Sequence, residues 1–237
     1  RMNEKALRTL EYHKIIDLLV RHANCEAAKQ RCKKLTPMTS LADIETAQRQ
    51  TADALSRIFK KGSLSFLGVH DVTASMKRLE IGAALSIEEL LHLASLLEVA
   101  KRAKAYSRND RTEEAETSDS LDEFFDAIEP LTPLLEEIRR CIISSDEISD
   151  DASSGLKAVR RSMKGMQDKI HSQMNSILNS ASASGLLQDN VITMRNGRYC
   201  LPVKSEYKNQ VSGMVHDQSS TGSTLFIEPL AVVNLNN

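Results

Sequence analysis

Residues that interrupt helices are scarce in this sequence. It contains 9 Gly, 5 Pro and no Trp among 237 residues, with many Ala, Leu, Lys, Glu and Gln, and this composition favours helix. No apolar run approaches the roughly 20 residues that a membrane-spanning helix needs, so no membrane partner is expected. Charged residues within the first eight positions also argue against a signal peptide.

Motifs that hold metals or nucleotides are missing as well. The four cysteines stand at positions 25, 32, 141 and 200 without a CxxC pair, so no zinc site is expected and reduced cytosolic cysteines are the preferred interpretation. Neither GxxxxGK(S/T) nor GxGxxG occurs, so no loop of these kinds is present to hold nucleotide phosphates. We therefore expect no metal, no cofactor and no catalytic residue in this chain.

The formal net charge of −1 conceals two blocks of opposite sign. Residues 109–151 contain fifteen Asp and Glu against three Arg, whereas residues 156–210 contain nine Lys and Arg against three acids. Concentrated positive charge keeps nucleic-acid binding open despite the neutral total. The acidic, aperiodic segment 107–120 is expected to be a mobile loop. Its Glu113, Glu114 and Glu116 lack partners at ligand spacing, so solvation is favoured over metal binding.

Residues 1–148 are predicted to form a helical core. Apolar residues recur at intervals of three and four through residues 4–34, which predicts a helical unit at the start of the chain. Ser40 can cap a further helix. Ser86 and Glu89 form a capping box ahead of a strongly apolar helix.

Residues 149–187 are predicted to form one long lever helix. About 34 residues from Asp150 to Ala183, at ~1.5 Å each, give a rod of roughly 50 Å. A compact chain of this size would be only about 45 Å wide, so the sequence predicts an elongated, mainly α protein. The apolar residues of this helix follow a near-heptad spacing. They are Leu156, Val159, Met163, Met166, Ile170, Met174 and Ile177.

After the long helix the apolar period changes from near 3.5 to 2, which predicts a small antiparallel β module near the C-terminal end. We call residues 188–229 the clamp module. Asn196 and Gly197 between two alternating runs are typical of a type I′ hairpin, and a second hairpin is expected downstream. Pro202 favours an edge position in its strand. Residues 230–237 are expected to begin a returning helix.

Positive charge continues from the long helix into the clamp module. Such a surface would bind a phosphate backbone with steep salt dependence and little sequence preference. A solvated helix face is the alternative interpretation. Arg198 and Lys204 lie an even number of residues apart and should share a face unless Pro202 introduces a bulge. The candidate phosphate contacts are Arg160, Arg161, Lys164, Arg195, Arg198, Lys204 and Lys208.

His216 and Asp217, followed by Ser219 and Ser220, have a superficial likeness to a hydrolase site. Adjacent strand residues point to opposite faces, so Asp217 is not expected to orient His216. No GxSxG elbow is present. The preferred interpretation has Asp217 capping the turn before Gly222 instead.

Two long runs in the clamp module resemble one particular family. They are residues 191–204 (VITMRNGRYCLPVK) and 213–229 (GMVHDQSSTGSTLFIEP), followed by residues 232–237 (VVNLNN). Upstream, residues 10–15 (LEYHKI) and 148–153 (ISDDAS) fit the same family, so the similarity covers nearly the whole chain. The sequence resembles the "type two" branch of the bacterial MutS-like proteins.

The resemblance implies more than the residues do by themselves. Members of this branch are cytoplasmic homodimers with core and lever helices, a clamp, an ABC-type ATPase that uses ATP and Mg²⁺, and usually a C-terminal Smr endonuclease domain. They are linked to suppressing recombination on branched DNA and to rescuing collided ribosomes. This chain matches only the core, lever and clamp. No catalytic residue is carried over, and the chain by itself is not expected to be an enzyme.

Two classes of function remain open at this point. In the first, the lever and clamp engage structured or branched DNA or ribosomal RNA, whose dense phosphate charge does not tell them apart. In the second, the chain is a protein-interaction or dimerisation scaffold without direct nucleic-acid contact, and its apolar stripe pairs with another helix. Partner binding that is insensitive to salt would favour the second class.

Overall fold

The computed structural model describes residues 3–108 and 118–237 of the 237-residue chain. Most of the acidic loop predicted over residues 107–120, including its three glutamates, lies outside the described residues. The chain divides into two compact units, Arg1–Ala152 and Ser153–Asn237. Each unit has a hydrophobic core of its own.

Helices and one short hairpin make up the described part of the first unit. Residues 4–34, predicted to be helical, are interrupted twice, first at Glu11, whose backbone is left-handed (φ 54°), and again at residues 22–25. The Tyr12 hydroxyl donates to the Leu35 carbonyl (3.0 Å), so the start of one helix meets the end of the next, a fold-back that apolar periodicity does not reveal. The elements are α1 (Glu4–Thr9), α2 (Tyr12–Arg21), α3 (Glu26–Lys33), α4 (Leu41–Lys61), α5 (Thr73–Glu80), α6 (Ile87–Arg108), α7 (Asp122–Asp126), α8 (Thr132–Cys141), β1 (Ile142–Ser144) and β2 (Glu147–Ile148).

The core of the first unit lies between α6 and α8. Leu97 of α6 packs in one cluster with Leu135 and Ile138 of α8. The capping box predicted ahead of α6 is confirmed, because the Ser86 hydroxyl accepts from the Glu89 amide (3.2 Å) and the Glu89 carboxylate accepts from the Ser86 amide (2.8 Å).

The second unit begins with the long helix α9 (Ser154–Ala183). The sequence predicts its start at Asp150, but Asp150–Ala152 form a short 3-10 turn, η1. The Ser153 hydroxyl accepts from the Leu156 amide (3.1 Å), and this side-chain cap sets the start of α9. The predicted end at Ala183 is confirmed.

A four-stranded antiparallel sheet follows α9. Its strands β3 (Thr193–Arg195), β4 (Arg198–Lys204), β5 (Gly213–Gln218) and β6 (Thr224–Pro229) lie in the order β3-β4-β6-β5. Asn196 and Gly197 have φ values of 51° and 74°, as a type I′ turn requires, so the predicted hairpin is confirmed. The edge position predicted for Pro202 is wrong, because β4 runs between β3 and β6. Pairing with β3 ends at Cys200, however, so the missing N–H of Pro202 does not interrupt that ladder. A 3-10 helix, η2 (Ser205–Gln210), connects β4 to β5.

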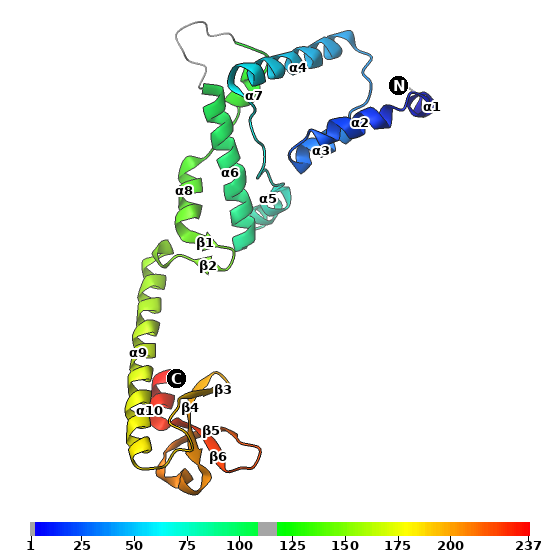
Figure 1. The fold of residues 1–237 in the computed structure, drawn as a ribbon. Helices are drawn as coiled ribbons and strands as arrows, with labels where there is room; N and C mark the ends of the chain where they lie inside the picture. Colours follow the sequence, from blue (N-terminus) through cyan, green and yellow to red (C-terminus); the bar gives the residue numbers. More distant parts are fainter. Residues whose placement is uncertain (1–2, 109–117) are drawn as a thin grey trace. The chain divides into compact units, whose positions relative to one another are not determined.

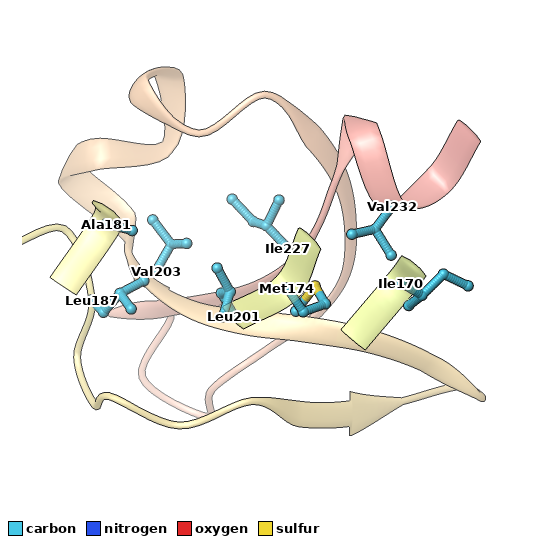
Figure 2. Packing of buried hydrophobic residues seen from close by; sticks show 8 residues of the cluster. All are labelled: Ile170, Met174, Ala181, Leu187, Leu201, Val203, Ile227 and Val232. Carbon is cyan, nitrogen blue, oxygen red and sulfur yellow. The ribbon is translucent and has the colours of Figure 1, made fainter. Parts of the chain in front are cut away.

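One face of this sheet packs against two helices. The second helix, α10 (Leu230–Asn236), begins where the sequence predicts and lies beside the C-terminal half of α9 (Figure 1). Leu201, Val203 and Ile227 of the sheet cluster with Met174 of α9 and Val232 of α10 (Figure 2), and each is at most 1% exposed. The fold is mainly helical with a small antiparallel β module near the C-terminal end, as predicted.

Candidate nucleic-acid interface

Basic residues gather along one side of α9. At about 100° per residue, Lys157, Arg160, Arg161 and Lys164 fall within an arc of about 100° beside the apolar stripe. Residues 154–167 contain these four basic residues and no acid. The first half of α9 therefore has one positive face.

Four of the predicted phosphate contacts have no acidic partner in the part of the chain that the structure describes. Two of the four, Arg161 and Lys164, are exposed on α9. Arg160, which is not one of the four, is half-buried between them and the apolar stripe. Lys204 lies at the end of β4, and Lys208 is exposed in η2. Exposed cations without a local acid are the groups that release counterions when they meet a phosphate backbone.

Three of the predicted contacts share one face of the sheet. Arg198 and Lys204 lie on the same face of β4, as predicted, because the pairing with β6 runs without a shift from Leu201 to Lys204 and Pro202 introduces no bulge. Arg195 lies directly opposite Arg198 across the hairpin and so shares that face.

Two of these arginines have acidic partners inside the clamp module. The Nε atom of Arg195 lies 3.3 Å from Oδ2 of Asp217, and its guanidinium carbon lies 4.1 Å from the centroid of the Phe226 ring. An amino nitrogen of Arg198 lies 3.3 Å from Oε1 of Glu228. Because each charge is balanced locally, these arginines attract phosphate less strongly than the cations on α9.

A β-bulge lies at His216. The register between β5 and β6 shifts between Val215 and Asp217, so His216 is an extra residue in its strand. His216 Nε2 lies 2.9 Å from Oε2 of Glu228, and Asp217 reaches Arg195 on the same face of the sheet. The prediction that His216 and Asp217 point to opposite faces is wrong, because the bulge breaks the alternation of the strand.

Glu228 is the residue of this site that sequence reasoning missed. Its side chain is 1% exposed and lies between Arg198 and His216. A buried carboxylate requires such partners. The available signal was a single acid within the otherwise apolar run of β6, whose last three residues are all buried.

The turn between β5 and β6 is closed by Ser219, so the cap predicted for Asp217 is wrong. The Ser219 hydroxyl accepts from the Thr224 amide (3.1 Å). Within the described ranges, no hydrogen bond joins His216 to Ser219 or Ser220. The arrangement of a nucleophile beside its general base is therefore not formed here.

The thiol of Cys200 is expected to be a poor nucleophile. Burial, and then the negative charge of Glu228, raise its pKa to about 11, so it stays protonated at neutral pH.

Among residues 3–108 and 118–237, no group of three or more His, Cys, Asp or Glu is placed to hold a metal ion. No helix of these same residues is long and apolar enough to cross a bilayer.

Comparison with curated proteins decides which family this chain resembles along its whole length. It is 57% identical over 240 residues to a protein of Lachnoclostridium phytofermentans and 55% identical over 236 residues to one of Agathobacter rectalis, both named "Endonuclease MutS2". A protein of Clostridioides difficile with the same name is 40% identical over 236 residues. Each alignment covers 100% of this chain. The chain is similar to MutS2 proteins along its whole length. No family model matches it.

The chain spans about 30% of the length of these relatives. The resemblance predicted from residues 191–204 and 213–229 is confirmed by the alignments, which include both runs. The names of the relatives describe proteins about three times as long, so they do not assign nuclease activity to this stretch.

Proposed function

We propose that this chain is the nucleic-acid-engaging core, lever and clamp part of a MutS-family protein. The observation that carries the proposal is the positive face of α9, where Arg161 and Lys164 are exposed and have no acidic partner among the described residues. Lys204 and Lys208 extend positive charge to the clamp module. Phosphate contacts of this kind bind DNA or RNA with little preference for sequence.

The full-length protein in this proposal is a cytoplasmic homodimer that hydrolyses ATP with Mg²⁺ and cleaves nucleic acid. It acts on branched DNA to suppress recombination, on collided ribosomes, or on both. The name "Endonuclease MutS2" of relatives about three times as long supports the nuclease part of this proposal. In this scheme the present residues bind and orient the nucleic acid, and the chemistry belongs to other parts of the protein.

A second candidate function is a protein-interaction or dimerisation scaffold. It is favoured by the N-terminal half of the apolar stripe, where Val159, Met163 and Met166 are 57%, 65% and 42% exposed. An exposed heptad-like stripe is a surface onto which another helix can pack. In this alternative the basic face of α9 is only a solvated surface.

Fluorescence anisotropy of the whole chain tests the proposal. The probes are a labelled four-way DNA junction and a labelled RNA hairpin at two salt concentrations. If the four cations without acidic partners meet phosphates, log K should fall against log salt with a slope of about −3 to −4. The double variant Arg161→Glu with Lys164→Glu should bind much more weakly, and its slope should fall by about half, to roughly −2.

The matched control is Lys29→Glu with Lys33→Glu, a half-buried and an exposed lysine of α3. It makes the same change in net charge outside α9 and should bind nearly as the unaltered chain does. Equal losses in both double variants would show that only net charge matters and would overturn the proposal. No binding of either probe by the unaltered chain, together with salt-independent self-association, would favour the scaffold.

A further inference from the structure

The guanidinium of Arg195 lies over an aromatic ring. Its guanidinium carbon lies 4.1 Å from the centroid of the Phe226 ring. The ring belongs to β6, where Phe226 pairs with Pro202 of β4 on one side and with Asp217 of β5 on the other. The arginine comes from β3, which β4 separates from β6 in the sheet, so its side chain reaches across β4 to the ring.

Two further contacts fix the plane of the guanidinium. Oδ2 of Asp217 lies 3.3 Å from the Nε atom, and the Met194 carbonyl accepts from an amino group at 3.2 Å. The bulge at His216 is what brings Asp217 into this position. A third contact, from the Asn196 side chain to the His216 carbonyl (3.2 Å), ties the hairpin turn to β5.

The Arg195 side chain is nevertheless 39% exposed. A guanidinium whose charge is balanced by a carboxylate has little attraction left for phosphate, but its flat surface still stacks well on a planar ring. Aromatic and arginine side chains on open sheet faces are the surfaces on which unpaired bases stack in proteins that bind single strands.

We infer that Arg195 and Phe226 form a stacking platform for an unpaired nucleobase. Bases inside a duplex are already stacked on their neighbours, so the ligand is a base in a single strand, a loop or a branch point. Arg198 and Lys204 share this face of the sheet and lie where they can meet the phosphates beside the stacked base. The inference rests on the proposed nucleic-acid binding and specifies which form of nucleic acid the clamp module prefers.

Anisotropy with two labelled oligonucleotides of about 12 nucleotides tests the platform. One is intact, and in the other the central nucleotides are abasic, so that both have the same phosphates. The unaltered chain should bind the intact strand roughly five- to tenfold more tightly than the abasic one. The variant Arg195→Lys keeps the positive charge but lacks the planar guanidinium group, so it should bind both strands equally well. Arg31→Lys, at an exposed arginine of α3, is the matched control and should retain the preference.

The variant Asp217→Asn separates stacking from charge, because it releases the guanidinium and adds one positive charge. If Arg195 contacts phosphate only, both strands should bind more tightly to Asp217→Asn. If Arg195 is a stacking platform, the preference for the intact strand should fall towards onefold. Thermal melting of each variant identifies any that fails to fold, and a variant that does not fold is replaced by Phe226→Leu, for which loss of the preference is again expected.

The two proposals fail in different ways. If the unaltered chain binds intact and abasic strands equally, or if Arg195→Lys retains the preference, the platform is wrong and phosphate binding by α9 still stands. If the unaltered chain binds neither strand and no junction or hairpin, the proposed function itself is wrong.

Discussion

The imidazole Nε2 of His216 lies 2.9 Å from Oε2 of Glu228, a carboxylate whose side chain is only 1% exposed. The other carboxylate oxygen faces Arg198 at 3.3 Å. One buried acid thus joins a residue of β4 and a residue of β5 to its own strand, β6. The contact with His216 depends on the bulge of β5, which a plain alternating strand would lack.

Removal of this carboxylate should loosen the sheet. The variant Glu228→Ala leaves Arg198 and His216 without their partner, and we expect the free energy of unfolding to fall by about 2–3 kcal/mol. This value is smaller than for a fully buried pair because the Arg198 side chain is 32% exposed. Hydrogen exchange of amides in β4 and β6 measures the change locally. Glu206→Ala, at an exposed acid in η2, should change protection by less than about 0.5 kcal/mol, and similar losses in both variants would contradict the prediction.

Thiol labelling should distinguish Cys200 from the other cysteines. Its pKa is raised to about 11 by burial, whereas Cys25, Cys32 and Cys141 are partly exposed. At pH 8 a disulfide reagent should therefore modify three thiols in the native chain and the fourth only after denaturation. Labelling of all four at one rate would show that Cys200 is accessible.

The same thiol makes stability depend on alkaline pH. Unfolded Cys200 ionises near its ordinary pKa of 9.0, whereas the folded thiol keeps its proton up to about 11. Between these values the folded state binds more protons than the unfolded state, so its stability falls as pH rises. In Cys200→Ala this contribution to the alkaline loss of stability should disappear, as urea unfolding at pH 8 and pH 10 can show.

Replacing a methionine by alanine should have very different effects on stability at two positions of the apolar stripe of α9. Met174 is 0% exposed and packs in the core of the second unit, whereas Met163 is 65% exposed. Met174→Ala should cost about 2–4 kcal/mol of unfolding free energy through lost burial and a cavity. Met163→Ala makes the same chemical change on the same helix and should cost less than about 0.5 kcal/mol. Equal costs in urea unfolding would mean that Met163 is covered in solution.

An ion pair in the first unit should give acid-dependent stability. Hydrogen bonds from Arg57, at 2.6 and 2.7 Å, hold the pKa of Asp119 below its ordinary value of 3.8. A lowered pKa stabilises the folded state above about pH 4, and this stabilisation is lost as pH falls through the folded pKa. Asp119→Asn should therefore lower the unfolding free energy by roughly 1–3 kcal/mol at pH 7 and by progressively less below pH 4. The control Asp17→Asn, at an exposed acid of α2, should behave as the unaltered chain does at both pH values.

Local patterns predicted the elements of the second unit well. The end of α9, the type I′ turn at Asn196 and Gly197 and the start of α10 each depend on residues a few positions apart. The start of α9 was placed four residues early, because the acids at 150 and 151 favour a first turn but the hydroxyl of Ser153 makes the actual cap. In the first unit, the fold-back between α2 and α3 escaped prediction because apolar spacing does not show where the backbone leaves the helix, as it does at residues 22–25.

The sequence by itself determined the helix-rich composition, the switch of period from near 3.5 to 2, the positive stretch of α9 and the resemblance that the alignments support. These follow from residue types at fixed short spacings. Only the tertiary structure decided which basic residues have an acidic partner and which remain available to bind phosphate. Arg195 meets Asp217 and Phe226, and Arg198 meets Glu228, across twenty to thirty intervening residues. Pairing over such distances depends on strand order, register and a one-residue bulge, and these are set by how the whole sheet packs on α9 and α10.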